Sequence, residues 1–293
     1  MYVPRVVAPL VELSRARIDV EGVPAVDGLS LTTSGDQVVI LGGAKALFEA
    51  VSGTRTPSHG EVRVRGVAAR RAARSGIVAG APIDLPLPPQ WTAREYLTWS
   101  ARISGHRKKD ATALAEQALT RMKMVGSAGE KLSGASVETR RSVSIAAALA
   151  TGAETILLED PLASLSGDAA RQLARIVLRA LEGRGWAIFA ARLPLESPFA
   201  MDASEAVVVA GNRVLAQGAP AELASRERAY ALKVLGHSEE FARVARARGA
   251  RVSGIGADLT VDLGPLAVSD LLRVAAEVEA TVLELEPVAY ALS

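Results

Sequence analysis

VVILGGAKALFEAVSG, residues 38–53, is the stretch that decides the fold. It begins with an apolar run typical of a buried strand, turns at Gly42 and Gly43, and continues as a helix. A strand, a glycine turn and a helix are also the parts of a phosphate-binding loop. The turn here is short, so the stretch is either a nucleotide site or a shortened connection derived from one.

Length and composition allow a sizeable core and exclude several functions. The 293 residues suffice for one large and one small domain, and 49% of them are hydrophobic. The net charge of +2 gives no electrostatic argument for nucleic acid. The absence of cysteine excludes disulfides and thiolate metal sites, and three scattered histidines predict no metal site.

The hydropathy of the chain indicates neither a signal peptide nor a membrane-spanning segment. Pro4, Arg5 and Pro9 interrupt the first residues, so we expect no signal peptide. No window reaches the roughly 18 uninterrupted apolar residues of a membrane span. The sequence therefore predicts a soluble chain that can dock on a membrane protein.

Short apolar runs alternate with longer helical stretches through the first 218 residues. The runs lack polar alternation, as parallel strands covered by helices do, and they are residues 37–41, 155–159, 186–191 and 206–210. Helical periodicity marks residues 92–105, 108–126, 138–152 and 167–185, the first opening with a Thr92–Glu95 capping box. This alternation predicts an α/β domain around a mostly parallel sheet, closed by a hairpin over 207–218.

The pattern changes near residue 229. The order there is strand, helix, two strands, helix and strand, which predicts a small βαββαβ, ferredoxin-like unit. Pro220 and a charged segment that follows it predict a domain boundary near residue 225.

Several segments together resemble a nucleotide-binding subunit of an ATP-binding cassette (ABC) transporter. They are TPSHGEVRVRG (56–66), WTAREYLTWSARISG (91–105), RRSVSIAAALATGAETILLEDPLASL (140–165) and SEAVVVAGNRVLAQGAPAEL (204–223). The C-terminal unit is similar to the extra domain of subunits that serve ABC-2-type exporters. The resemblance implies a P-loop-NTPase-like ABC ATPase domain over 1–225, with a mostly parallel sheet, an antiparallel β part and a helical subdomain at about 84–150. A ferredoxin-like domain then covers 226–293.

The phosphate loop of that family departs from its pattern here. The pattern G-x-x-x-x-G-K-[ST] counted from Gly42 puts the lysine position at Phe48. Counting back from the segment after the helix puts it at Ala44 and the hydroxyl position at Lys45. The two counts disagree because about three or four loop residues are missing. Gly42, Gly43, Ala44 and Lys45 are therefore interpreted as a vestigial nucleotide-binding segment.

Two further motifs of the family are altered. Its catalytic strand ends in Asp then Glu, whereas this strand ends Glu159–Asp160, so both are interpreted as vestigial catalytic positions. The segment LSG at 132–134 looks like the family signature, but an ungapped count back from VSIAAALA favours 135–139, in which only Ser136 survives. The first alignment needs a three-residue insertion, and the second replaces both glycines.

Three residues that the family uses are missing. Ala191 occupies the position of the switch histidine, Ile83 lies where the Q-loop glutamine is expected, and no aromatic residue for stacking on adenine lies between Tyr2 and Phe48. The resemblance thus implies the fold without an intact catalytic or nucleotide-binding residue and without a metal or cofactor.

The sequence-based hypothesis is a non-catalytic subunit that acts as a scaffold or regulatory partner in an ABC-2-like complex. By resemblance, it would lie in the cytoplasm on the inner face of the cell membrane. It would pair with a second ABC-type subunit, as a homo- or heterodimer, and dock on a permease. The docking residues would be Ile83, Leu85, Leu87, Trp91 and Tyr96. One alternative is a weak ATPase that binds ATP and Mg²⁺ through Lys45, Glu159 and Asp160; another is a structural adaptor without transport.

Overall fold

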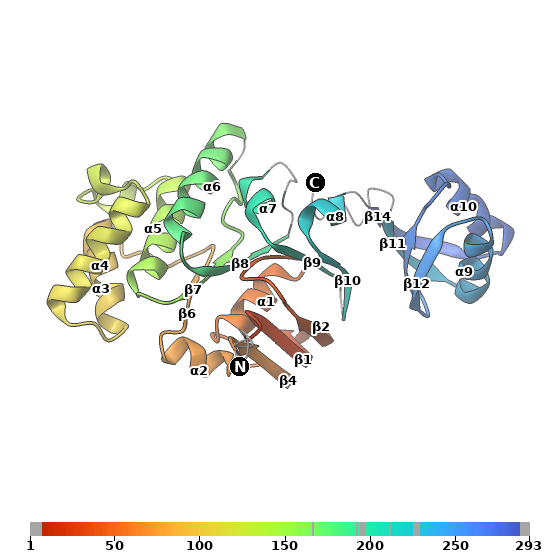
Figure 1. Ribbon diagram of the computed structural model, residues 1–293, viewed down its shortest axis with the longest axis horizontal. Helices are drawn as coiled ribbons and strands as arrows, with labels where there is room; N and C mark the ends of the chain where they lie inside the picture. The colour runs from red at the N-terminus through yellow and green to blue at the C-terminus, as the bar shows by residue number, and fades with distance from the viewer. Residues whose placement is uncertain are drawn as a thin grey trace, which may run out of the picture.

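The computed structural model describes residues 8–165, 167–191, 193, 197–210, 212–224 and 229–287. Its strands form three sheets, two in the larger N-terminal part and one in a separate C-terminal unit (Figure 1). The predicted α/β fold class, with its mixed sheets and helical part, is confirmed. The predicted boundary near residue 225 falls outside the described residues.

The central sheet has the strand order β10-β9-β3-β8-β7-β6. Its strands are parallel except for β10, which forms a hairpin with β9. Successive residues of β3 enter two different cores, Val38 and Ile40 on one face and Val39 and Leu41 on the other, which explains its lack of polar alternation. The strands are β3 (Gln37–Leu41), β6 (Val78–Ala81), β7 (Thr155–Glu159), β8 (Gly185–Ala190), β9 (Glu205–Ala210) and β10 (Arg213–Gly218).

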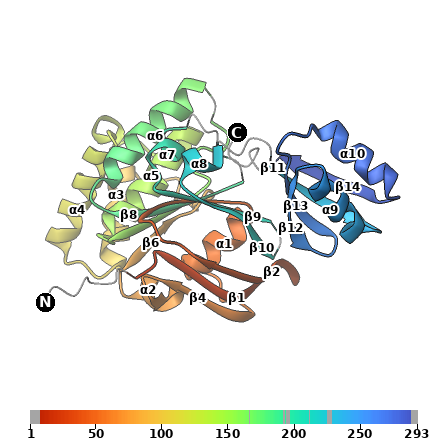
Figure 2. The same ribbon diagram turned by 45° about the vertical axis from the view of Figure 1, so that its right-hand side comes forward.

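An antiparallel sheet covers one face of the central sheet, with helix α1 between them (Figure 2). Phe48 of α1 meets Phe189 of the central sheet edge to face, with ring centroids 6.1 Å apart. The elements of this layer are β1 (Val11–Val20), β2 (Val23–Thr32), α1 (Ala44–Val51), β4 (His59–Val64), β5 (Val67–Ala68) and α2 (Ala69–Arg74).

Helices cover the opposite face and extend into the helical part. Thr92 and Glu95 form the predicted capping box at the start of α3, so this prediction is confirmed. The helices are α3 (Ala93–Ile103), α4 (Lys108–Arg121), α5 (Val137–Ala150), α6 (Gly167–Leu181), α7 (Pro198–Asp202) and α8 (Pro220–Ala224), with short 3-10 turns η1 (Val125–Ser127) and η2 (Leu132–Gly134).

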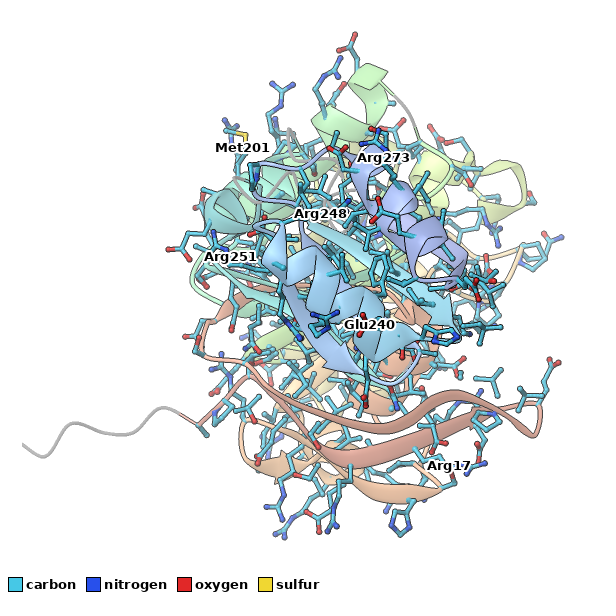
Figure 3. The ribbon with its side chains drawn as sticks, turned by 90° about the vertical axis from the view of Figure 1, so that its right-hand side faces the viewer. Arg17, Met201, Glu240, Arg248, Arg251 and Arg273 are labelled. Carbon is cyan, nitrogen blue, oxygen red and sulfur yellow. The ribbon has the colours of Figure 1, made fainter. Side chains whose placement is uncertain are left out.

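The C-terminal unit has the predicted βαββαβ order and its own hydrophobic core. Its antiparallel sheet has the order β12-β13-β11-β14, with α9 and α10 on one face. Figure 3 looks onto the charged exterior of this unit, where Arg248 pairs with Glu277 and Arg273 with Asp270. The elements are β11 (Ala229–Leu235), α9 (Ser238–Ala247), β12 (Arg251–Ile255), β13 (Asp258–Asp262), α10 (Val268–Glu277) and β14 (Thr281–Pro287).

Candidate functional site

The connection from β3 to α1 contains two residues, because the strand ends at Leu41 and the helix begins at Ala44. Gly42 and Gly43 both adopt left-handed backbone angles, with φ of 89° and 58°. The Gly42 N–H donates to the Ala190 carbonyl at 3.1 Å. A Cβ on Gly42 would clash with the Val209 carbonyl oxygen, so the turn is closed against the neighbouring strand.

Lys45 lies in the first turn of α1 and its side chain is exposed. Within the described part of the chain it makes no hydrogen bond or ion pair, and Ala44 before it offers no side-chain donor. Its charge is nevertheless close enough to Glu159 to favour the ionised form of that carboxylate. Lys45 is thus near the end of β7 without being bound to it.

Glu159 ends the buried strand β7 and is only 6% exposed. Its Oε2 accepts a hydrogen bond from the Ile83 N–H at 3.0 Å, so the carboxylate binds the loop that follows β6. Burial raises the pKa of Glu159, while the bond from Ile83 and the charge of Lys45 act in the opposite direction. The predicted vestigial positions Glu159 and Ile83 are therefore in direct contact.

Arg141 lies beside this pair and was not identified from the sequence. It is 6% exposed; its Nη1 donates to the Ile83 carbonyl at 2.6 Å, and its Nη2 to the Ala163 carbonyl at 3.4 Å. Burial lowers the pKa of Arg141, and the charges of Asp84, Asp160 and Glu159 oppose that effect. The guanidinium, which stays protonated in proteins, is a fixed buried cation joining the loops after β6 and β7.

Two features make Arg141 unusual as a structural arginine. Its Nε has no hydrogen-bond partner among the described residues, although the group is buried. It also forms no ion pair within 4.0 Å with the three carboxylates around it, among the pairs that the structure describes. Its charge is therefore balanced at longer range, while its hydrogen bonds go to backbone carbonyls.

Asp160 follows Glu159 in a left-handed conformation, with φ of 41°. Its N–H donates to the Phe189 carbonyl at 2.8 Å, and its carboxylate accepts from the Ala191 N–H at 3.5 Å. Burial raises the pKa of Asp160, whereas the Ala191 bond and Arg141 lower it. Ala191, predicted to be a vestigial position, contributes its backbone N–H to the carboxylate of Asp160.

Ser136 caps helix α5. Its hydroxyl accepts from the Thr139 N–H at 3.1 Å, which satisfies one of the free donors of the first turn. LSG at 132–134 lies upstream in the 3-10 turn η2, so Ser136 is the serine at the helix N-terminus. This geometry gives Ser136 a structural role that needs no ligand.

The predicted docking segment divides into buried and accessible residues. Leu87 and Tyr96 are buried in the main core, while Ile83, Leu85 and Trp91 are partly buried. Tyr96 is in contact with the rings of Trp91 and Trp99, at centroid distances of 6.4 and 5.5 Å. Leu87 and Tyr96 therefore support this region from beneath and do not form its outer surface.

Trp99 and Ile103 are the exposed apolar side chains on the same helix, at 42% and 65% exposure. Trp99 stacks edge to face on Trp91, with the centroids 5.9 Å apart. Neither residue is among the five predicted docking residues, although their spacing of four places them on one side of α3. We call Trp91, Trp99 and Ile103 the α3 surface.

No group of three or more His, Cys, Asp and Glu side chains in the described ranges is arranged to hold a metal ion. Among those residues, no helix is both long and apolar enough to cross a bilayer.

Comparison with curated proteins finds relatives that bind ATP by name. Arabinose import ATP-binding protein AraG 2 of Burkholderia cenocepacia is 31% identical over 192 residues, which are 61% of this chain and 37% of that protein. Taurine import ATP-binding protein TauB of Mesorhizobium japonicum is 30% identical over 170 residues, or 54% and 63% of the two chains. The match thus spans less than two thirds of either relative. No model of a known protein family matches the chain.

Solved structures share the fold. The protein cbiO1 of Clostridium perfringens, part of the ABC transporter complex cbiONQ, superposes with a TM-score of 0.62 at 17% identity, covering 83% of this chain and 96% of that one. An ATP-binding subunit of an ABC transporter covers 91% and 99%, with a TM-score of 0.59 and 13% identity. The fold is therefore that of ABC-transporter ATP-binding subunits. The sequence resemblance to such subunits is supported by these relatives and structures.

Proposed function

We propose that this chain is an ABC-type subunit of a membrane transporter and that it does not hydrolyse ATP. The first half of the proposal is supported by the relatives, which are ATP-binding proteins of import systems by name. The second half rests on the geometry between β3 and α1.

The observation that carries the proposal is the two-residue connection Gly42–Gly43. A phosphate-binding loop has four residues between its first glycine and its Gly-Lys pair, and their N–H groups surround the phosphates. Here the Gly42 N–H is bonded to Ala190, and the Val209 carbonyl lies against its Cα. Losing three charge-assisted hydrogen bonds would cost roughly 5–9 kcal/mol if additive, which weakens a micromolar site beyond millimolar.

The surrounding carboxylates support the same conclusion. Glu159, at the position expected to serve Mg²⁺, binds the Ile83 N–H instead. Ala191 has no side chain that could act as the switch histidine. Arg141 supplies a permanent cation among Asp84, Glu159 and Asp160, which offsets part of the negative charge of these carboxylates.

The proposed partners are a permease subunit and a second ABC-type subunit, as a homo- or heterodimer. The α3 surface is the region we propose for the permease, because Trp99 and Ile103 are exposed, Trp99 packs on the partly buried Trp91, and exposed apolar side chains favour protein contacts. A position on the inner face of the cell membrane follows from such a partner. The exporter class remains a prediction from the C-terminal unit, because the named relatives belong to importers.

Isothermal titration calorimetry of the purified chain with ATP and Mg²⁺ tests the loss of nucleotide binding. We expect no saturable binding up to about millimolar nucleotide, and the same result for Lys45→Ala. Micromolar binding that Lys45→Ala weakens would contradict the proposal and favour the weak ATPase. The exposed Lys109→Ala variant is the matched control, since Lys109 lies on α4, away from this turn.

Affinity purification of the intact membrane complex tests the partners. Recovery of a permease in a fixed ratio to this chain supports the transporter. A stable complex composed only of soluble proteins would instead favour the structural adaptor.

A further inference from the structure

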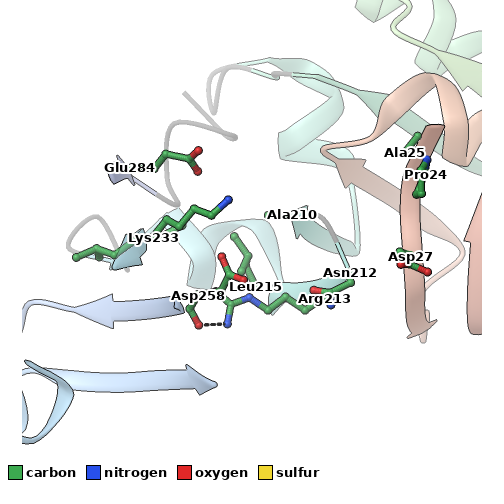
Figure 4. A pocket seen from close by; sticks show the side chains of 12 residues that line it. Pro24, Ala25, Asp27, Ala210, Asn212, Arg213, Leu215, Lys233, Asp258 and Glu284 are labelled. Atoms are coloured by element: carbon green, nitrogen blue, oxygen red, sulfur yellow. Dashed lines mark hydrogen bonds between the residues drawn. The ribbon is translucent and has the colours of Figure 1, made fainter. Parts of the chain in front are cut away.

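A cavity lies between the N-terminal part and the C-terminal unit. Its volume is about 410 Å³, within the range of small-molecule pockets. Strand β2 and the β9–β10 hairpin form one side, and strands β11, β13 and β14 form the other (Figure 4). The charged lining residues are Asp27, Arg213, Lys233, Asp258 and Glu284.

Arg213 crosses from the hairpin to the C-terminal unit. Its Nη1 donates to the Asp258 carbonyl at 2.5 Å, the bond drawn in Figure 4. Gly254 makes room for it, because a Cβ there would lie 2.7 Å from Nη1. Since a guanidinium has five N–H donors, Arg213 is a positioned cation with donors left for a ligand.

Lys233 supplies a second cation from the opposite side. On the open face of the C-terminal sheet it is directly opposite Asp258 on β13 and Glu284 on β14. Opposed residues have Cβ atoms about 4.5–5.5 Å apart, close enough for long side chains to meet. Nevertheless, no ion pair or hydrogen bond of Lys233 occurs among the described residues, and in Figure 4 its side chain extends toward the hairpin.

The cavity therefore contains cationic and anionic side chains that form no ion pairs with one another among the described residues. Arg213 and Lys233, from the two parts of the molecule, can bind a carboxylate. Glu284 and Asp258, beside Lys233, can accept hydrogen bonds from an ammonium group. We propose that this cavity binds a free amino acid, and that the bound amino acid joins the N-terminal part to the C-terminal unit.

The test is calorimetric titration of the nucleotide-free chain with the standard L-amino acids. Succinate and putrescine serve as probes that carry only one kind of charge. We expect at least one amino acid to bind saturably, and succinate and putrescine to bind at least about tenfold more weakly, a difference of about 1.4 kcal/mol. Because no nucleotide is present, the outcome is independent of the proposed transport function.

Two variants locate the binding. Lys233→Met and Glu284→Gln should each weaken it by about tenfold or more, while the exposed Lys109→Met should leave it unchanged. Unchanged unfolding midpoints would show that the variants are folded; if Lys233→Met is not, Lys233→Gln and Glu284→Gln carry the test. Absence of saturable binding up to about 10 mM, equal binding of succinate or putrescine, or binding unaffected by these substitutions would overturn the proposal.

Discussion

At the scale of single residues, the end of β7 is governed by two buried charges of opposite sign. Glu159 accepts the N–H of Ile83, and Arg141 donates to the carbonyl of the same residue. Both backbone groups of Ile83 are thus satisfied by side chains from elsewhere in the chain. The cost of this arrangement is that a carboxylate and a guanidinium are removed from water.

Glu159→Gln should change the pH dependence of stability. Burial raises the pKa of Glu159 above its ordinary 4.5, so the folded chain binds that proton more tightly than the unfolded chain. The stabilisation by the protonated form is complete below the unfolded pKa and is lost as pH rises through the folded pKa. The neutral glutamine avoids this loss. The free energy of unfolding of the variant, relative to wild type, should therefore increase as pH rises, by about 1.4 kcal/mol for each unit of pKa elevation.

Urea unfolding of both proteins at intervals from about pH 4 to pH 8 measures this difference. Glu138→Gln is the matched control, because it removes a carboxylate at an exposed position. A stability difference for Glu159→Gln that is flat or falls with pH would mean that burial does not dominate at this carboxylate.

The sequence predicted Glu159 and Asp160 but not Arg141, and the reason is physical. Two carboxylates after an apolar run mark the end of a buried strand. An arginine in the first half of a helix with another arginine beside it is normally solvated. Only the fold shows that Arg140 is exposed while Arg141 points inward to two carbonyls.

At the scale of elements, the two glycines between β3 and α1 have unequal roles. Both have positive φ, but Gly42 lies against a backbone carbonyl, whereas the nearest atom to a Cβ on Gly43 is 3.5 Å away. A side chain at Gly42 is therefore disfavoured both by the backbone angle and by the Val209 carbonyl. A side chain at Gly43 is disfavoured by the backbone angle alone.

Gly42→Ala should destabilise the protein by about 3 kcal/mol or more, and Gly43→Ala by only about 1 kcal/mol. The larger value combines left-handed strain with displacement of the Val209 carbonyl, while the smaller reflects strain alone. Urea unfolding at neutral pH gives both numbers. Equal losses would show that β9 moves freely away from the turn, contrary to the close contact described here.

The strand, turn and helix around these glycines follow from local sequence, but the contact with Val209 does not. Residues 38–51 carry their own signals of apolar run, glycine pair and helical periodicity. Val209 belongs to a hairpin far along the chain that pairs with β3 only in the assembled sheet. Such a contact depends on strand order, which local periodicity does not specify.

At the scale of the whole molecule, the C-terminal unit has a core that is separate from the two cores of the N-terminal part. Phe241 is fully buried in the core of the C-terminal unit, and Leu97 is fully buried in one core of the N-terminal part. Separate cores favour separate unfolding.

Scanning calorimetry should accordingly resolve two transitions. Phe241→Ala should destabilise only the C-terminal unit, by about 3–5 kcal/mol, and Leu97→Ala only the N-terminal part, by about 2–5 kcal/mol. A single transition lowered by both variants would show that the two parts unfold as one.

The sequence predicted strands β3, β7, β8 and β9 and the βαββαβ order of the C-terminal unit from their periodicity and turn residues, but it did not predict β1, β2 or β6. The cavity between the parts was not predicted either. Its charges come from residues such as Arg213 and Lys233, which look like ordinary surface positions until the N-terminal part and the C-terminal unit are placed together.

The two-residue turn at Gly42 and Gly43 also limits how this lineage can change. A phosphate-binding loop at this place would need an insertion of the right length and composition, and a substitution alone would not create one. Any such insertion must first displace the Val209 carbonyl from its position against Gly42. The length of this turn is therefore expected to be harder to change than the identity of an exposed residue.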